Sequence, residues 1–441
     1  MIKKAKKLLF FFFFLPAFLI LFFRLFHRRA TQGIKVKDLG KFKKENLVPD
    51  PSKKKKIKNI TIVELEGFPY EIGYQNGTLL KEEIHKILYE AYERYLPKGS
   101  LKSYLARALV MWVVKRVDKE IPLEYRQEMQ GVADGAGMSY NDVLLMNAFM
   151  DGFESLDPIL LQVIYSLSGL EPGCSSVIVH KSENSSHLII GQTVDYMITI
   201  SAGRSVLYVI KSPGKQTLFM PSFPGLIGCL NGANEAGLVL TQRATPTGKG
   251  EIGMPVNLHF RQILEDSDSL EQARDNINRT KWSIPRSIII ADSRENKSSF
   301  FEILPGKGVK EIEIKKHAGA ANHFKTKEFH EIQKAALRKY KFLQIWGLYE
   351  KYLSFYDNSL RRERYLQNYV ENETWATPEK IIKAISDYDP RLTIPGGTVS
   401  NQQTEQAMVF VPEEKTIYLA NGLKPPVTQG GFIKIDLKKW C

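Results

Sequence analysis

Cysteine and histidine are scarce in this chain. Its 441 residues include three cysteines, Cys174, Cys229 and Cys441, and none of them belongs to a CxxC pair. Three isolated cysteines exclude a disulfide framework. The eight histidines are scattered and lack the compact spacing of zinc ligands. We therefore expect neither a metal ion nor another cofactor.

Most of the chain also lacks net charge. The formal net charge is +14, but residues 1–60 contain 17 Lys and Arg against three acidic residues and account for all of it. Residues 61–441 contain 45 basic and 45 acidic residues. A balanced globular part offers no basic stripe for phosphates, so nucleic acid is not an expected partner.

A hydrophobic run, Leu8–Phe23, lies near the start between clusters of Lys and Arg. It is short for a membrane span but long for the core of a signal peptide, and no small-x-small cleavage motif follows it. We expect residues 1–29 to be an uncleaved single-pass membrane anchor, with a cleaved signal peptide as the alternative. Residues 30–60 are then a basic, solvated tether to an extracytoplasmic domain.

The pattern of the remaining sequence changes at Gly173. Residues 61–173 show mostly helical periodicity, interrupted by a break at 135–137. Residues 174–441 contain several strand-like runs separated by turn residues, with a return to helical periodicity over 330–388. This order predicts an α+β fold in which antiparallel sheets pack between helical layers.

Cys174 occupies an unusual position, between a turn and a strand. A free cysteine is usually a small buried hydrophobic residue, an interpretation that fits Cys229 and Cys441. Before Cys174, however, Pro172 fixes the approach of the chain and Gly173 permits a strained backbone. If the bond between Gly173 and Cys174 were cut, one residue would carry both a thiol and an α-amine. Because an α-amine titrates near pH 7.7–8.0, it can act as the general base for the thiol without a histidine.

Several stretches resemble the isopenicillin-N acyltransferase-like branch of the N-terminal nucleophile hydrolases, which are relatives of penicillin V acylase, bile salt hydrolase and acid ceramidase. In order along about residues 60 to 420, they are ELEGFPYEIGYQNG, MQGVADGAGMSYNDVLLMN, GCSSVIV, GQTVD, GANEAGL, SIIIADS followed by Phe301 and Glu302, and ANHF. The resemblance implies a four-layer αββα core and self-cleavage between Gly173 and Cys174.

The same resemblance implies roles for individual residues. Cys174 matches the nucleophile, and Asp195 matches the aspartate that holds the new α-amino group. Asn322 matches the asparagine that donates a hydrogen bond to the oxyanion of the tetrahedral intermediate, whereas His323 beside it is expected to be structural.

The sequence departs from the family pattern at one position. The pattern around the aspartate is often Gly-Arg-Asn-x-Asp, and here Gln192 stands in the place of the arginine. Arg243 is the candidate to supply this charge or to bind substrate, the alternative being an exposed arginine at a strand end. Arg391 is a candidate, by position, for the family's C-terminal arginine.

These features predict a self-processing cysteine amidohydrolase or acyltransferase. It would act on a linear amide (C–N) bond of a small acyl-amide substrate, such as an N-acyl lipid or an acyl-peptide, through an acyl-enzyme on Cys174. Water as the acceptor gives hydrolysis, and a second amine gives acyl transfer. Two alternatives remain: a catalytically silent, membrane-tethered binding domain that keeps the fold, and a papain-like thiol hydrolase that requires a partner histidine.

Overall fold

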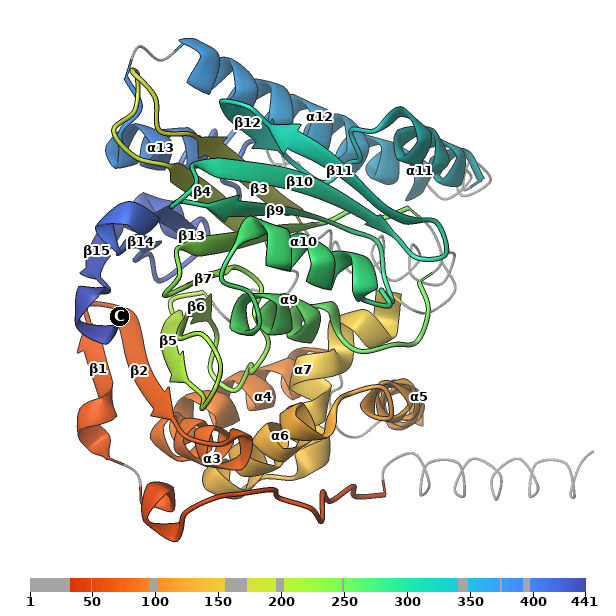
Figure 1. Ribbon diagram of the computed structural model, residues 1–441. Coiled ribbons are helices and arrows are strands. Elements are labelled where there is room, and N and C mark those ends of the chain that lie inside the picture. Colours follow the sequence, from red (N-terminus) through yellow and green to blue (C-terminus); the bar gives the residue numbers. More distant parts are fainter. Residues whose placement is uncertain are drawn as a thin grey trace, which may run out of the picture.

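Two β-sheets stacked face to face form the centre of the molecule, and helices cover both outer faces (Figure 1). The computed structural model describes residues 32–48, 50–95, 101–154, 173–195, 202–247, 250–339, 348–372, 375–391 and 397–441. The helix-sheet-sheet-helix order agrees with the predicted α+β class.

Nine strands form the larger sheet and six form the smaller one. In spatial order the larger sheet contains β1 (Lys54–Ile57), β2 (Ile60–Glu66), β5 (Val206–Lys211), β6 (Leu218–Ser222), β7 (Gly232–Asn234), β8 (Leu238–Ala244), β9 (Arg286–Asp292), β10 (Lys297–Leu304) and β11 (Gly308–Ile314). The smaller sheet contains β12 (His317–Ala320), β3 (Gly173–Val179), β4 (Ile189–Asp195), β13 (Thr404–Val411), β14 (Thr416–Ala420) and β15 (Phe432–Asp436). Neighbouring strands are antiparallel, except that β2 and β5 are parallel.

The helices form two groups. The larger sheet packs against α3 (Pro69–Leu79), α4 (Lys81–Tyr95), α5 (Leu101–Asp118), α6 (Leu123–Ala136), α7 (Tyr140–Glu154), α9 (Val256–Glu265) and α10 (Leu270–Arg279). The smaller sheet is covered by α12 (Leu348–Asn372) and α13 (Pro378–Ile385), and α11 (Lys327–Lys339) lies beside α12 (Figure 1). Thr377 caps α13 by accepting a hydrogen bond from the Lys380 N–H, as its place before Pro378 suggests.

Strand alternation divides the apolar side chains among three cores. On β9, Ile288 and Ile290 face the helical layer, whereas Ile289 faces the smaller sheet. On β3, Ile178 enters the core between the sheets, and Val177 packs against the outer helices. Because both faces of these central strands are buried, their sequences are almost continuously apolar.

Two helices of the first portion approach each other closely through glycines. A Cβ atom on Gly73 of α3 would lie 1.9 Å from the Glu128 carbonyl oxygen of α6, and one on Gly131 of α6 would lie 2.2 Å from the Tyr70 carbonyl oxygen. Side chains at these positions would therefore force the helices apart. The break predicted at 135–137 is the end of α6, where Gly137 adopts φ +68° as the C-cap.

The described residues of the expected tether between 32 and 57 are mostly exposed, but a few of them bind the helices and the larger sheet. The Val36 N–H donates to the Gln130 side chain of α6 at 3.0 Å, and the Lys43 N–H donates to the buried Glu71 of α3 at 2.6 Å. Further on, Lys54–Ile57 forms the edge strand β1 against β2. Side chains of α3 and α6 thus accept hydrogen bonds from the backbone of this basic segment, which its composition alone did not indicate.

The predicted single-pass membrane localisation requires correction. Within the described ranges, the structure contains no helix long and apolar enough to cross a bilayer, which contradicts the predicted single-pass span. Charged residues are spread along α12, the longest of these helices, and also interrupt α5. The run Leu8–Phe23 and the anchor expected over residues 1–29 lie outside the described residues.

Candidate active site

The ends of β3 and β4 bring Cys174 and Asp195 together. In the antiparallel register Gly173 lies opposite Asp195, and Cys174 lies opposite Val194. The Cys174 side chain belongs to the core between the two sheets and is 3% exposed. Residues at opposite ends of the segment 173–195 therefore meet at one end of the β3–β4 pair.

Gly173 is required by the close approach of the Asp195 carboxylate. A Cβ atom on Gly173 would lie 2.4 Å from Asp195 Oδ2. That carboxylate cannot easily retreat, because Asn401 Nδ2 donates to Oδ2 at 2.7 Å and the Thr404 hydroxyl donates to Oδ1 at 2.6 Å. The φ of Gly173 is not left-handed, so the glycine serves this close contact and not the strained backbone expected from the sequence.

Burial dominates the electrostatics of Asp195. It raises the pKa of the carboxyl to about 6, although the charge of Arg362 and the hydrogen bonds from Thr404 and Asn401 act in the opposite direction. The side chain therefore titrates close to neutral pH in the uncleaved chain.

Asn322 follows β12 and contacts Cys174 directly. Its Oδ1 accepts a hydrogen bond from the Cys174 backbone N–H at 2.9 Å, and its Nδ2 donates to the Ala244 carbonyl at 2.8 Å. Its own backbone N–H donates to the Ser359 hydroxyl at 2.7 Å. The loop after β12 thus holds the Asn322 amide at the peptide nitrogen of Cys174.

Arg362 of α12 is a site residue that the sequence analysis missed. Its Nη1 donates to the Cys174 carbonyl at 3.0 Å and to the Ser175 hydroxyl at 2.8 Å, while its Nη2 donates to Asn322 Oδ1 at 2.9 Å. The side chain is buried, as are Ser359 and Leu366 on the same helix. The sequence shows Arg362 at helical spacing from these two residues, which places it on the covered face of the helix but does not indicate a contact with Cys174.

Arg391 does not occupy the site. It is largely exposed and forms an ion pair with Asp389 at 2.8 Å. Arg391 was chosen by its position along the chain, whereas the fold brings Arg362 to Cys174.

The Cys174 thiol lies in a strongly desolvated environment. Burial, together with the charge of Asp195, raises its pKa to about 11, although the charges of Arg243, Arg362 and Arg286 act in the opposite direction. Gln242 Nε2 lies 4.0 Å from the sulfur. In the uncleaved chain the thiol is therefore protonated at neutral pH.

Arg243 is fully buried and is not an exposed arginine at a strand end. Its guanidinium donates to the Ser176 hydroxyl and, at 3.3 Å, to the Ser287 hydroxyl, and it lies over the Phe300 ring. Ser176 in turn donates to Gln192 Oε1. Gln192 is thus connected through Ser176 to a cation that comes from the other sheet. Burial lowers the pKa of Arg243 to about 9, against the opposing charge of Cys174.

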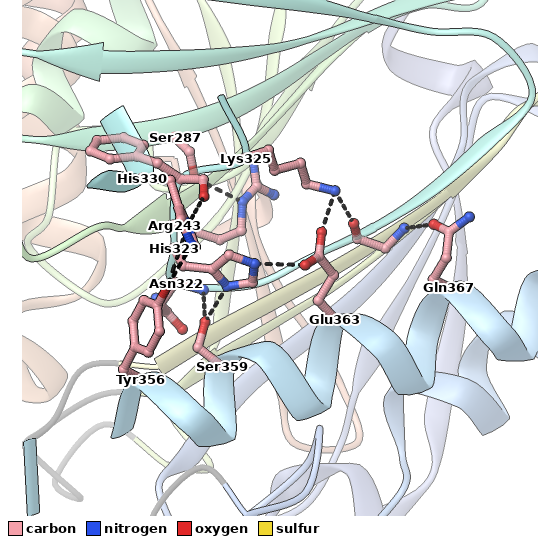
Figure 2. Close-up of polar contacts among 12 residues, drawn as sticks. Arg243, Ser287, Asn322, His323, Lys325, His330, Tyr356, Ser359, Glu363 and Gln367 are labelled. Carbon is pink, nitrogen blue, oxygen red and sulfur yellow. Dashed lines mark hydrogen bonds and ion pairs between the residues drawn. The ribbon is translucent and has the colours of Figure 1, made fainter. Parts of the chain in front are cut away.

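His323 is bound by other side chains (Figure 2). Its Nδ1 lies 2.8 Å from the Ser359 hydroxyl, and its Nε2 lies 2.6 Å from Glu363 Oε2. Although burial opposes ionisation of Glu363, hydrogen bonds and charges from His323 and Lys325 hold its pKa at about 2. Since both ring nitrogens have partners, the geometry favours the structural role expected for His323 over the base of a papain-like pair.

The other two cysteines differ in burial. Cys229 is buried, as the sequence suggested, whereas Cys441 is exposed, and both are free. Among the residues that the structure describes, no three His, Cys, Asp or Glu side chains gather where they could hold a metal ion.

Comparison with known proteins identifies the family of the chain. The family model for acyl-coenzyme A:6-aminopenicillanic acid acyl-transferase matches residues 181–420, more than half of the chain. The chain belongs to this acyl-transferase family. The matched segment includes Asp195, Arg243, Asn322 and Arg362, and it begins just after Cys174.

Individual relatives cover shorter stretches. An uncharacterised protein of Archaeoglobus fulgidus is 27% identical over 248 residues, which are 53% of this chain and 41% of that protein. The 40 kDa form of acyl-coenzyme A:6-aminopenicillanic-acid-acyltransferase from Emericella nidulans is 25% identical over 235 residues, 53% of this chain and 61% of its own. N-acylethanolamine-hydrolyzing acid amidase of Caenorhabditis elegans is 22% identical over 218 residues, which are 47% of this chain and 57% of that protein. The chain thus spans about half the length of these relatives.

Among solved structures, the Caenorhabditis elegans N-acylethanolamine-hydrolyzing acid amidase ortholog matches with a TM-score of 0.39 and 15% identity. The match covers 54% of this chain and 93% of that one. A mutant of conjugated bile acid hydrolase from Clostridium perfringens matches with a TM-score of 0.37 and 11% identity. This match covers 60% of this chain and 93% of that one.

Within this acyl-transferase family member, the structure brings five of the predicted residues to one region. Asn322 contacts Cys174, Asp195 contacts Gly173, and Arg243 contacts Ser176 two residues further along β3. The arrangement places an amide, a carboxylate and guanidinium groups around one buried thiol and its peptide bond.

Proposed function

We propose that the chain is a self-processing cysteine amidohydrolase or acyltransferase with Cys174 as its nucleophile. The observation that carries the proposal is the environment of the Gly173–Cys174 bond. Asp195 lies against Gly173, Asn322 accepts from the Cys174 N–H, and Arg362 donates to the Cys174 carbonyl. Buried polar groups thus lie against Gly173 and hold the N–H and the carbonyl of Cys174, an arrangement that a merely structural cysteine does not require.

Self-cleavage would proceed through a thioester. The Cys174 sulfur attacks the Gly173 carbonyl carbon, the C–N bond between the two residues breaks, and the thiol proton passes to the released nitrogen. Water then opens the thioester, which yields the Gly173 carboxylate and restores the thiol. The products are residues 1–173, whose described part is mainly helical, and residues 174–441, the catalytic portion.

After cleavage the α-amine of Cys174 would act as the general base. With a pKa of about 7.7–8.0 it can accept the thiol proton at neutral pH and return it to the leaving amine. Asp195, opposite Gly173 in the strand register, is positioned to bind the resulting ammonium group. The acyl group leaves Cys174 when water or a second amine attacks the thioester.

The remaining polar groups would serve the transition state and the substrate. Asn322 Nδ2, now bonded to the Ala244 carbonyl, is the proposed donor to the oxyanion. Arg243 supplies positive charge from the larger sheet, in the absence of an arginine at Gln192, and is the proposed contact for the substrate. The names of two relatives, an acyltransferase and an acid amidase, support a small acyl-amide as the substrate class.

Mass spectrometry after incubation with N-acyl amides tests this function. We expect the wild type to gain the mass of the acyl group on the fragment that begins with Cys174, and to release the amine. Cys174→Ala should do neither. Cys229→Ala is the matched control, because Cys229 is also free and buried and should leave the reaction unchanged. A wild type that never acquires an acyl group or releases an amine would instead favour the silent binding domain.

A further inference from the structure

Helix α12 presents three polar side chains to the segment that carries Asn322. Ser359, Arg362 and Glu363 are three and four residues apart, so they lie on one face of the helix. Each of them is hydrogen-bonded to Asn322 or to His323, which follows it. We call these three residues the α12 clamp. Self-cleavage and acyl transfer as proposed above require neither Ser359 nor Glu363, so their contacts need another explanation.

The Ser359 hydroxyl holds the backbone of Asn322. It accepts a hydrogen bond from the Asn322 N–H at 2.7 Å, and both residues are fully buried. A buried backbone donor that loses its acceptor is costly, and the chain shifts to find another partner. Removal of the hydroxyl is therefore expected to displace Asn322.

His323 in turn holds the Ser359 hydroxyl (Figure 2). Its Nδ1 lies 2.8 Å from Ser359 Oγ, and its Nε2 lies 2.6 Å from Glu363 Oε2. Because a carboxylate can only accept, Nε2 carries a proton. Nδ1 then accepts from the hydroxyl when the ring is neutral and donates to it when the ring is charged. Lys325 binds the other carboxylate oxygen of Glu363, so the carboxylate is itself fixed.

Arg362 fixes the side chain of Asn322. Its Nη2 donates to Asn322 Oδ1 at 2.9 Å, and the same oxygen accepts from the Cys174 N–H. With Oδ1 directed at two donors, the amide nitrogen points to the Ala244 carbonyl. The α12 clamp thus determines both the place of the Asn322 backbone and the orientation of its side-chain amide.

The contacts with α12 do not depend on the bond that self-cleavage would break. Cleavage between Gly173 and Cys174 would convert the Cys174 N–H, which now donates to Asn322 Oδ1, into part of an amine that serves as the base. The bonds that Ser359 and Arg362 make to Asn322 involve no atom of that peptide group. In the processed enzyme these two bonds would remain to hold Asn322.

We propose that Ser359 and His323 are positioning residues for the oxyanion donor. His323, fixed by Glu363, holds the Ser359 hydroxyl, and this hydroxyl holds Asn322 where its Nδ2 reaches the oxyanion. The inference rests on the proposed function, which assigns Asn322 to the transition state. Oxyanion donors act when they are preorganised, and a misplacement of about 1 Å can cost about 10²-fold in rate. A residue that only supported the fold would alter stability without altering kcat.

Steady-state kinetics on octanoyl para-nitroanilide, a small N-acyl amide, test the inference. Each kcat is divided by the fraction of the chain that mass spectrometry shows to begin with Cys174, which removes any effect on self-cleavage. We expect Ser359→Ala to lower kcat about 10- to 100-fold with little change in KM, because the oxyanion donor moves while ground-state binding is kept.

Two replacements of His323 separate positioning from stability. In His323→Asn the side-chain oxygen lies near the place of Nδ1 and can still bind the Ser359 hydroxyl. In His323→Gln the longer amide reaches the place of Nε2 and binds only Glu363. Both variants lose the ring, so their melting temperatures should be similar. We expect His323→Asn to keep kcat within about threefold of the wild type and His323→Gln to lose about tenfold or more.

Gln367→Ala is the control on the same helix. Gln367 Oε1 accepts from the Gly319 N–H at 2.9 Å, three residues before Asn322, so this variant loses a similar contact between α12 and the same segment. It should keep the kcat of the wild type. If Ser359→Ala also keeps that kcat, or if His323→Asn and His323→Gln lose it equally, the inference is overturned and the proposed function stands.

Hydrogen–deuterium exchange in the full Cys174→Ala chain tests the contacts without catalysis. We expect Ser359→Ala and His323→Gln to raise the exchange rate of the Asn322 N–H at least about tenfold, and Gln367→Ala to leave it unchanged. A wild type that turns over no N-acyl amide contradicts the proposed function, and faster exchange at Asn322 then still supports the α12 clamp. Unchanged exchange in both Ser359→Ala and His323→Gln would contradict the clamp whether or not the wild type is active.

Discussion

The side-chain oxygen of Asn322 accepts a hydrogen bond from the backbone N–H of Cys174 at 2.9 Å. The two residues are 148 positions apart in the chain. In the uncleaved protein this bond holds the peptide nitrogen that self-cleavage would release. The Asn322 amide nitrogen donates one of its two hydrogens to the Ala244 carbonyl, so the second is the one available for the proposed oxyanion.

Replacement of Asn322 tests its role in the transition state. We expect Asn322→Ala to lower kcat for amide cleavage about 10²- to 10³-fold, because one oxyanion donor is lost, while KM changes little. Stopped-flow or steady-state kinetics on the processed enzyme measure both constants. A change confined to KM would show that Asn322 binds substrate without stabilising the transition state.

Arg362 is expected to support the site through its three hydrogen bonds. Arg362→Met keeps most of the apolar stem but leaves the Cys174 carbonyl and Asn322 Oδ1 without this donor. We expect it to lower the unfolding free energy by about 2–4 kcal/mol and to slow self-cleavage. Arg391→Ala is the control, since Arg391 is exposed and should leave both unchanged. Normal stability and processing of Arg362→Met would contradict the assignment.

Asp195 should make stability depend on pH between about 4 and 6. Its pKa is raised from 3.8 to about 6, so the stability from the protonated carboxyl is complete below about pH 4. It is lost as pH rises through about 6. Relative to Asp195→Asn, the unfolding free energy of the uncleaved chain should therefore fall by up to about 3 kcal/mol from pH 4 to pH 7. Urea unfolding in the Cys174→Ala background measures this difference, and a difference constant with pH would refute the shift.

Glu363 should make stability depend on pH in the opposite sense to Asp195. Its pKa is lowered from 4.5 to about 2, so its contribution is present above about pH 4.5 and is lost as pH falls toward 2. We expect the stability advantage over Glu363→Gln, up to about 3 kcal/mol at pH 6, to shrink steadily below pH 4.5. The exposed Glu371 of the same helix provides the control variant Glu371→Gln. An advantage that persists unchanged at pH 3 would argue against the ion pair with His323.

The sequence predicted the parts of the site that depend on local pattern. Gly173, Cys174 and Asp195 lie in one strand pair, and Asn322 lies in the stretch ANHF on which the resemblance partly rested, so these candidate residues could be named in advance. Arg362 could not, because α12 brings it to Cys174 from 188 residues away.

The fold class was easier to predict from the sequence than the contacts made by residues 30–60. Continuous apolar runs such as that of β9 arise because both faces of a central strand are buried, and this indicates packed sheets. By contrast, the basic composition of residues 30–60 gave no sign that Val36 would be buried or that Lys54–Ile57 would form an edge strand. Those contacts depend on acceptors placed by helices and strands far along the chain.

The central claim is that Cys174 becomes an N-terminal nucleophile. Intact mass measurement and N-terminal sequencing of the purified wild type and Cys174→Ala test it most directly. We expect two fragments of the wild type, one of which begins with Cys174, and a Cys174→Ala chain that remains whole. A wild type that stays a single chain, with no free amine on Cys174, would contradict it.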